Sequence, residues 1–117
     1  MKKIALFVTT LMLLAAVALA DAPAAPLEKV EPAKVCMINE QYMNRPQIPI
    51  TVEGKTYYGC CDACKERLAK DATKRVATDP VSGKEVDKAM AVIGAAADGR
   101  VLYFENEKNL AKYNAGK

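Results

Sequence analysis

The segment E-G-K-T-Y-Y-G-C-C-D-A-C-K-E-R at residues 53–67 contains three of the chain's four cysteines. It opens with a Glu-Gly pair, which favours a tight turn, and continues with the aromatic segment K-T-Y-Y-G at residues 55–59. Before the turn, apolar residues alternate with other residues over positions 48–52, which is the pattern of a half-buried strand. We therefore predict a β-hairpin over residues 48–59.

A short helix is predicted directly after this hairpin. Asp62 is a residue type that commonly caps helix N-termini, and the charged residues after it continue to about Lys70. Cys60, Cys61 and Cys64 therefore fall at the junction of strand and helix. Because Cys60 and Cys64 are four positions apart, the start of the helix places both on one face.

The same order of elements recurs in the C-terminal part of the chain. The sequence predicts strands at residues 89–93 and 100–104 with a small-residue loop between them, and a final helix capped by Asn106. Shifting residues 54–68 by 45 positions aligns them with 99–113 and matches a glycine, a basic residue and a tyrosine. We interpret this match as an internal duplication.

The second copy carries no sulfur at the aligned positions. The alignment pairs Cys60, Cys61 and Cys64 with Glu105, Asn106 and Asn109, and it pairs Cys36 with Ser82 to within one residue. We expect the exposed acid Glu105 to lie at the start of the second helix. The hairpin-and-helix scaffold of this copy is therefore expected to form without cysteines.

Residues 1–20 have the pattern of a secretory signal peptide. Lys2 and Lys3 form a basic start, an apolar run extends to Val17, and A-L-A at residues 18–20 is a small-x-small cleavage site. The apolar run is shorter than the roughly 20 residues of a membrane-spanning helix. We therefore expect a periplasmic or secreted protein with no membrane span after signal cleavage.

Residues 21–34, D-A-P-A-A-P-L-E-K-V-E-P-A-K, contain three prolines and four alanines. We predict a flexible linker here because few bulky apolar residues are available for burial. The predicted α+β chain thus consists of a signal peptide (1–20), a linker (21–34), a cysteine-bearing unit (35–77) and a second unit without cysteines (78–117).

The composition disfavours several classes of function. The net charge of the chain is only +3, two of its lysines belong to the signal peptide, and there is no basic cluster, so nucleic acid is not an expected partner. The chain has no histidine and no tryptophan, and it has no nucleophile motif. An acid–base enzyme is therefore not expected.

Four cysteines in a small exported chain leave three alternatives open. In the absence of histidine, thiolates are the strongest soft ligands available, which favours a metal site. An even number of cysteines in an oxidising compartment also suits disulfides, although a bond between the neighbours Cys60 and Cys61 would be strained. Cys61 and Cys64 form a C-x-x-C motif, which is the spacing of a metal knuckle or of a redox dithiol.

Two segments carry a resemblance to a known family. They are V-C-M at residues 35–37 and G-K-T-Y-Y-G-C-C-D-A-C-K-E-R-L at residues 54–68. Together they resemble the YHS/TRASH type of small metal-binding domain, in which one cysteine is followed, after a spacer, by an aromatic strand and a C-x-x-x-C pair. The segments at residues 79–86 and 99–113 are similar to a YHS unit that has lost its cysteines.

The resemblance implies two treble-clef-like units of hairpin plus helix in tandem, and a role in heavy-metal sensing, trafficking or resistance. Cys36, Cys60 and Cys64 match the three-cysteine pattern, so the resemblance implies that they are the metal ligands. Cys61 is additional to that pattern and leaves the fourth ligand open. Three thiolates suit Cu(I), whereas tetrahedral Zn(II) would recruit Cys61 or a water.

The resulting hypothesis is an exported protein that buffers or carries Cu(I) or Zn(II), with a metal transporter or another metal-handling protein as its partner. A disulfide-stabilised interaction module and a thiol redox protein that uses Cys61 and Cys64 are the alternatives. Met37 is a candidate thioether ligand, although packing in a core is the more common role of methionine. Tyr57 and Tyr58 are expected to pack in their strand.

Overall fold

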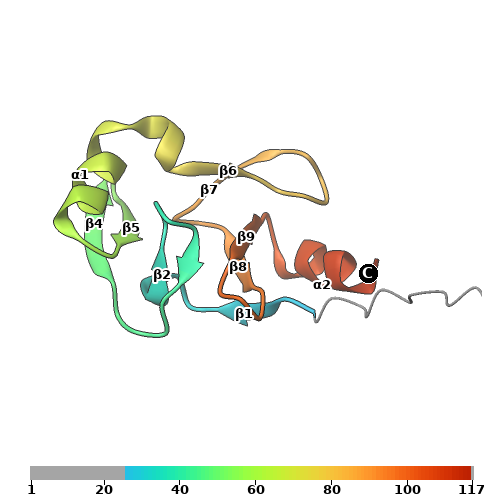
Figure 1. Ribbon diagram of the computed structural model, residues 1–117. Helices are drawn as coiled ribbons and strands as arrows, with labels where there is room; N and C mark the ends of the chain where they lie inside the picture. The colour runs from blue at the N-terminus through green and yellow to red at the C-terminus, as the bar shows by residue number, and fades with distance from the viewer. Residues whose placement is uncertain (1–25, 117) are drawn as a thin grey trace, which may run out of the picture.

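The computed structural model describes residues 26–116, which have an α+β fold, as predicted (Figure 1). Small antiparallel sheets and two α-helices make up this part of the chain. The predicted signal peptide, residues 1–20, lies outside the described residues. None of the helices in residues 26–116 is long and apolar enough to cross a membrane.

The first hairpin forms where the sequence predicts it. Strands β4 (Ile48–Val52) and β5 (Lys55–Gly59) pair antiparallel along their full lengths. The turn residues Glu53 and Gly54 both have positive φ angles, 53° and 77°. This is the conformation that two-residue hairpin turns favour, because its twist matches the twist of the strands. The Glu-Gly pair thus fixes the register of the hairpin.

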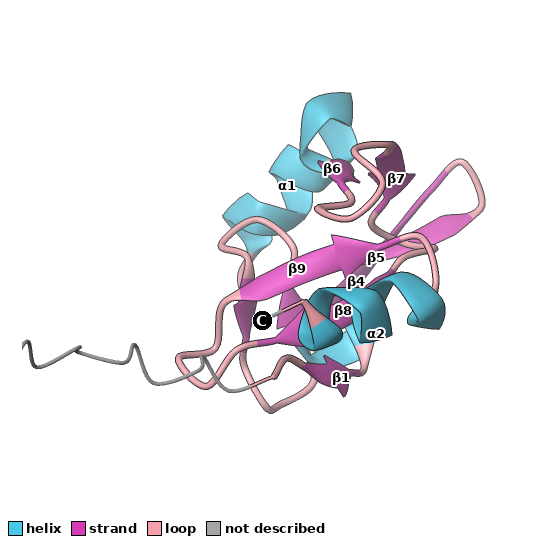
Figure 2. Cartoon of the chain, turned by 90° about the vertical axis from the view of Figure 1, so that its right-hand side faces the viewer, coloured by secondary structure: helices cyan, strands magenta, loops and turns pink. Residues whose placement is uncertain are grey.

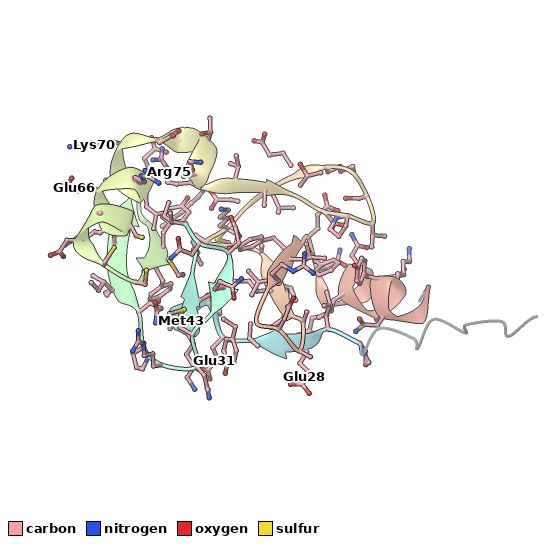
Figure 3. All side chains as sticks on the ribbon, in the orientation of Figure 1. Glu28, Glu31, Met43, Glu66, Lys70 and Arg75 are labelled. Carbon is pink, nitrogen blue, oxygen red and sulfur yellow. The ribbon has the colours of Figure 1, made fainter. Side chains whose placement is uncertain are left out.

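Helix α1 (Asp62–Lys70) follows, but its cap differs from the prediction. The N-cap is Cys61, which has extended backbone angles of φ −154° and ψ 172°. Asp62 instead occupies the first helical position, where its negative charge stabilises the positive end of the helix. At the other end, Nη1 of Arg75 donates to the carbonyl oxygen of Leu68 at 2.7 Å, so the guanidinium lies against the last turn (Figure 3).

The second hairpin consists of strands β8 (Val92–Ala95) and β9 (Val101–Phe104), and helix α2 (Glu107–Ala115) follows it. Asn106 caps α2, as predicted. Its side-chain oxygen accepts a hydrogen bond from the backbone N–H of Asn109 at 2.8 Å, which satisfies one of the free N–H groups at the start of the helix.

Strand β8 begins at Val92, later than the predicted strand at residues 89–93. Asp87 explains the difference. Its side chain accepts a hydrogen bond from the N–H of Ala89 at 2.9 Å, and its carbonyl oxygen accepts from the N–H groups of Met90 and Ala91, both at 3.0 Å. These bonds hold the chain in a turn up to the start of β8.

The sequence does not predict strand β1 (Glu28–Val30). This strand pairs with β8 and makes the second hairpin a three-stranded sheet of order β1-β8-β9 (Figure 2). The N–H of Leu27 donates to Oδ1 of Asn114 at 2.9 Å. Leu27 also packs over Gly94: a Cβ added to Gly94 would lie 3.1 Å from the Cβ of Leu27. This part of residues 21–34 therefore differs from the flexible linker expected there, because an exposed strand edge supplies its hydrogen bonds.

Two shorter hairpins precede the larger ones along the chain. Strand β2 (Val35–Cys36) pairs with β3 (Gln41–Tyr42), and β6 (Val76–Thr78) pairs with β7 (Glu85–Asp87). The 3-10 helices η1 (Pro32–Lys34) and η2 (Ala72–Lys74) lead into β2 and β6. Each half of the described chain thus contains a short hairpin, a longer hairpin and a helix, in that order.

The two halves share geometric details. Helices α1 and α2 each have 9 residues, and their first residues, Asp62 and Glu107, are 45 positions apart. The N-caps Cys61 and Asn106 have nearly the same backbone angles, φ −154° and ψ 172° against φ −159° and ψ 172°. A common origin of the halves, their boundary at residues 77 and 78 and their treble-clef character stay predictions.

A single hydrophobic core joins the two halves. Its buried side chains from the first half are Val35, Met37, Tyr57 and Leu68, and those from the second half are Val86, Ala91, Ile93, Ala95, Val101 and Tyr103. Because the core contains residues from both halves, changes in the second half are expected to affect the stability of the first.

Candidate metal centre

Three cysteine sulfur atoms meet between the end of a short strand and the start of a helix. Cys36 ends β2, Cys60 follows β5, and Cys64 lies in the first turn of α1. The Sγ atoms of these three residues all lie within 4.8 Å of one another. The structure thus brings together the three cysteines that match the family pattern.

Cys61 lies beside this group without belonging to it. Its Sγ atom is 3.4 Å from that of Cys64, but Cys61 is not among the residues whose sulfur atoms are mutually within 4.8 Å. The Sγ atoms of Cys60 and Cys64 are 3.6 Å apart. All four cysteines are free, and these separations exceed the roughly 2.05 Å of a disulfide bond.

The separations between the sulfur atoms suit a shared metal ion. Zn–S bonds are about 2.3 Å long, so two sulfur ligands of a tetrahedral zinc ion lie about 3.8 Å apart. The 3.6 Å between Cys60 and Cys64 is already close to this distance. A cluster of thiolates selects soft or borderline ions, a group that includes Cu(I) and Zn(II). The cysteine cluster could therefore hold a metal ion, whose identity the donor atoms leave open.

One side of the cluster is buried and the other faces solvent. Cys36 is 0% exposed and Cys64 is 7% exposed, whereas Cys60 is half-buried and Cys61 is exposed. An ion bound here would be covered by protein on the side of Cys36 and Cys64. It would be reached from solvent on the side of Cys60 and Cys61.

Backbone N–H groups favour the ionised form of two thiols. Burial alone would raise the pKa of Cys36, but the N–H groups of Asn39 and Ile38 donate to its sulfur and lower that pKa below its usual value. The N atom of Asn39 is 3.5 Å from this sulfur. The start of α1 likewise lowers the pKa of Cys61, chiefly through the backbone N–H of Cys64.

The other two thiols hold their protons more strongly. Burial raises the pKa of Cys64 to about 12, and its contacts with Cys61 and Cys60 add to the effect. The pKa of Cys60 is raised mainly by its contact with Cys36. Because the thiolate is the form that binds a metal, an incoming ion must displace these protons. Metal binding to this cluster is therefore expected to release protons.

Gly59 allows α1 to begin close to the end of β5. An added Cβ at this position would lie 2.9 Å from the Cβ of Cys64, which is too short for two carbon atoms that are not bonded. The missing side chain therefore lets Cys64 approach the segment that carries Cys60. Gly59 thus helps to set the spacing of the cysteines.

The loop after β2 holds Cys36 in place. The N–H of Met37 donates to the carbonyl oxygen of Tyr58, and the N–H of Glu40 donates to that of Cys36, both at 2.9 Å. Nδ2 of Asn39 donates to the sulfur of Cys60 at 3.3 Å. Asn39 carries no signal in the sequence, because an asparagine in a loop is common for reasons of backbone conformation alone.

A buried lysine from the second half supports the same loop. Lys88 is 3% exposed. Its Nζ atom donates to the carbonyl oxygen of Met37 at 2.8 Å and forms an ion pair with Glu40. It also lies 5.2 Å from the ring centre of Tyr103, within range of a cation–π interaction. No local pattern identifies Lys88, since its partners lie 48 and 51 residues away.

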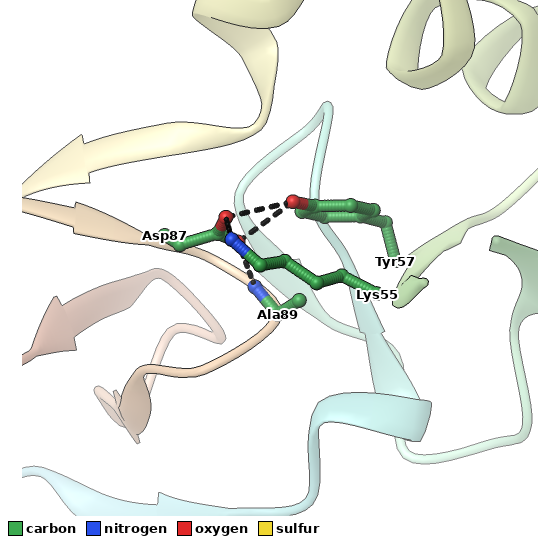
Figure 4. Close-up of polar contacts among 4 residues, drawn as sticks. All are labelled: Lys55, Tyr57, Asp87 and Ala89. Carbon is green, nitrogen blue, oxygen red and sulfur yellow. Dashed lines mark hydrogen bonds and ion pairs between the residues drawn. The ribbon is translucent and has the colours of Figure 1, made fainter. Parts of the chain in front are cut away.

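A second contact between the halves centres on Asp87 (Figure 4). Its carboxylate accepts hydrogen bonds from the hydroxyl of Tyr57 at 2.7 and 2.9 Å and from Nζ of Lys55 at 2.9 Å. Burial raises the pKa of Tyr57 to about 12, with the contact to Asp87 adding to the shift, so the hydroxyl remains a donor at neutral pH. Strand β5, which leads to Cys60, is thereby fixed to β7.

In the second half, hydrogen bonds replace the cluster of sulfur atoms. The buried carboxylate of Asp79 accepts from the N–H groups of Val81 and Ser82 at 2.6 and 3.1 Å. It also accepts from the N–H of Glu105 and from Nδ2 of Asn109, both at 2.8 Å. The last two residues are those that align with Cys60 and Cys64. The loop and the helix of the second half are thus joined through polar groups.

Asp79 shares a hydrogen-bond pattern with Cys36 that Ser82, its aligned partner, does not show. The side chains of Asp79 and Cys36 both accept hydrogen bonds from the backbone N–H groups of the second and third residues after them. Their carbonyl oxygens both accept from the N–H of the fourth residue, at 2.8 and 2.9 Å. These hydrogen bonds favour Asp79 over Ser82 as the counterpart of Cys36, and the match between the two halves stays a prediction.

The side chains of two other residues considered from the sequence take no polar part in the cysteine cluster or its counterpart. Met37 is 0% exposed and belongs to the hydrophobic core, which is the more common role of methionine. Glu105 is exposed, as expected, and it contributes to the contact with Asp79 only through its backbone N–H.

Comparison of the chain with protein-family models, curated proteins and solved structures found no match. The resemblance to the YHS/TRASH domain therefore stays a prediction from the sequence.

Proposed function

We propose that this chain is a small exported protein that holds Cu(I) or Zn(II) with the thiolates of Cys36, Cys60 and Cys64. The observation that carries the proposal is the approach of these three sulfur atoms, from three separate segments, to within 4.8 Å of one another. Export rests on the signal-like sequence of residues 1–20, and the YHS/TRASH resemblance supports the same role. Buffering, trafficking and resistance are the roles open to such a protein.

The chemistry of the site suits binding and transfer. The ligands are all cysteines, and the chain contains no histidine that could act as a general base near them. A bound ion would be accessible from the side of Cys60 and Cys61, which are the less buried cysteines. We therefore infer a protein without enzymatic activity, whose partner is a metal transporter or another metal-handling protein.

One observation favours a second function, thiol–disulfide exchange. Cys61 is exposed and has a lowered pKa, Cys64 is buried and has a raised pKa, and their sulfur atoms are 3.4 Å apart. In a redox dithiol, an exposed thiolate attacks the substrate disulfide and a buried partner completes the exchange. This pair has the same asymmetry.

Metal content and free thiols of the purified protein distinguish the two functions. The protein is purified from the periplasm of an expressing bacterium under anaerobic conditions, its thiols are counted, and bound metal is measured by native mass spectrometry. We expect one metal ion per chain. Cys36→Ser, Cys60→Ser and Cys64→Ser should each lose it, whereas Cys61→Ser should retain it.

Two disulfides in the purified protein, with no uptake of Cu(I) or Zn(II) after reduction, would overturn the metal-binding proposal. Reduction of insulin disulfides by a metal-free wild-type protein, lost in both Cys61→Ser and Cys64→Ser, would instead establish the redox function.

A further inference from the structure

We propose that Cys61 is the thiolate through which the metal ion is exchanged with a partner that presents its own thiolate or thioether. This inference rests on the proposed metal-binding function and assigns a separate role to the cysteine that lies outside the group of three. The partner's donor is identified by chemistry, because an ion held by thiolates passes most readily to another soft ligand.

The position of Cys61 places it within reach of an ion bound by Cys64. The two sulfur atoms are 3.4 Å apart, which is close to the separation of about 3.8 Å for two sulfur ligands of one zinc ion. The sulfur of Cys61 is therefore close enough to that of Cys64 for the two to share one ion. Cys61 is also the exposed member of the four cysteines, so a partner can contact it directly.

The three other cysteines are contacted by protein groups or buried. Cys36 receives the backbone N–H of Asn39, and Cys60 receives the side-chain amide of the same residue. Cys64 lies in the first turn of α1 and its side chain is buried. On the solvent side, the residues that follow Cys61 are the short and exposed Asp62 and Ala63. The approach to Cys61 is therefore free of large side chains from these neighbours.

The exchange proceeds by ligand replacement with no change in the oxidation state of the metal. The thiol of Cys61 loses its proton to solvent and its sulfur bonds to the ion. The bond from Cys64 to the ion then breaks, and the released thiolate takes up a proton from solvent. A thiolate or thioether of the partner then bonds to the ion. As further donors of the partner bind, the bonds from Cys36, Cys60 and Cys61 break in turn, and each released thiolate takes up a proton from solvent. Loading follows the same steps in reverse.

Transfer kinetics of the loaded full chain test this role. The wild-type protein, Cys61→Ser and a control variant, Ala63→Ser, are loaded with Cu(I) under anaerobic conditions. Each is then mixed with excess bathocuproine disulfonate or dithiothreitol, with loss of Cu(I) followed by stopped-flow absorbance. If the purified protein carries zinc, Zn(II) is loaded in place of Cu(I), and 4-(2-pyridylazo)resorcinol is the acceptor. Equilibrium competition with the same chelator gives the affinity, and thermal unfolding verifies that all variants are folded.

The expected result separates rate from affinity. Cys61→Ser should slow transfer by about tenfold, which corresponds to the loss of about 1.4 kcal/mol of stabilisation at the exchange step, while its affinity stays within about threefold of wild type. Ala63→Ser should match the wild type in both. An unchanged transfer rate in Cys61→Ser overturns the inference and leaves the metal site intact. A tenfold or greater loss of affinity in Cys61→Ser also overturns it, because Cys61 would then be a permanent ligand. Failure of the wild type to bind metal overturns the proposed function itself.

Discussion

Asp79 and Asn109 connect a loop to a helix in the second half of the protein. Cys36 and Cys64 approach each other at the equivalent place in the first half. The carboxylate of Asp79 lies 2.8 Å from Nδ2 of Asn109, and both residues are buried. One half therefore closes this contact with hydrogen bonds, and the other presents sulfur atoms that a metal ion can join. The second half therefore closes this contact without cysteine.

Replacing Asp79 with alanine should destabilise the protein strongly. The change leaves the N–H groups of Val81, Ser82 and Glu105 and the amide of Asn109 without their acceptor. Because a buried donor without a partner costs about 1–3 kcal/mol, we expect the free energy of unfolding to fall by about 3 kcal/mol. Urea denaturation of the reduced, metal-free protein measures the change.

The nearby variant Lys84→Ala is a suitable control for Asp79→Ala, since the side chain of Lys84 is exposed in the same loop. Its free energy of unfolding should stay within about 0.5 kcal/mol of wild type. A similar small change for Asp79→Ala would contradict the central role of the carboxylate.

Asp79 should also make stability depend on pH. Burial alone would raise the pKa of Asp79, but hydrogen bonds from the side chain of Asn109 and from backbone N–H groups hold it below its usual value. A carboxyl group whose pKa is lowered by folding stabilises the folded state above its unfolded pKa, and this contribution is lost as the pH falls. We therefore expect stability to decline below about pH 4.

Comparison with Asp79→Asn isolates this contribution from those of other acidic residues. The variant cannot titrate. It keeps one oxygen acceptor, but its NH2 group replaces the other oxygen and faces the donors on that side, so its stability is expected to be lower at every pH. The change of stability with pH is therefore compared. Urea denaturation of both proteins across the acidic range should show a smaller decline for the variant. Parallel curves for the two proteins would show that Asp79 does not contribute to the acid sensitivity.

Lys88 should link the stability of the fold to the affinity of the metal site. Lys88→Met removes the hydrogen bond to the carbonyl oxygen of Met37 and leaves Glu40 without its cation. Because Glu40 is partly exposed, we expect a loss of about 2 kcal/mol, less than the 3–5 kcal/mol of a fully buried pair. The loop that carries Cys36 loses a support, so metal affinity should also fall, by about tenfold.

The double variant Lys88→Met with Glu40→Gln tests the ion pair within this contact. Neutralising Glu40 should recover part of the lost stability, as measured by urea denaturation, because no uncompensated charge remains. Full additivity of the two single changes would show that the pair is not coupled. Unchanged metal affinity in Lys88→Met would separate the lysine from the site.

Local patterns in the sequence predicted the elements that depend on neighbouring residues. The Glu-Gly turn and the alternating apolar residues gave the hairpin at residues 48–59, and Asn106 gave the start of α2. Strand β1 was not predictable in this way, because its hydrogen bonds go to β8. The composition of this segment alone favours a linker, and pairing with β8 gives it the extended conformation of a strand.

The candidate site shows the same limit. The spacing of Cys60 and Cys64 placed them on one face of a helix, which is a local argument. The approach of Cys36 was expected from the resemblance to a family and from a loop length that a hairpin can bridge, and the structure now supplies the contact. Lys88 and Asp79 act on residues 26 to 51 positions away, and a single charged residue carries no pattern that would reveal such a partner.

The correspondence of Asp79 with Cys36 also predicts that a second metal site can be built. The triple variant Asp79→Cys, Glu105→Cys, Asn109→Cys places sulfur at the positions equivalent to the three clustered cysteines. We expect native mass spectrometry of this variant to show two metal ions per chain in place of one. Its metal-free form should be less stable than wild type, and added metal should restore stability, because binding to the folded state alone shifts the unfolding equilibrium.

A matched variant tests the correspondence itself. Ser82→Cys, Glu105→Cys, Asn109→Cys introduces the same number of cysteines but uses the position that the sequence alignment favours. The hydrogen bonds of Asp79 place Ser82 in the role that Asn39 has beside Cys36, as the third residue of the loop, so its side chain is not equivalent to that of Cys36. We therefore expect this variant to bind one metal ion tightly and to gain no second site. Equal metal content in the two triple variants would show that the loop tolerates either position, and that the hydrogen-bond pattern of Asp79 does not define the site.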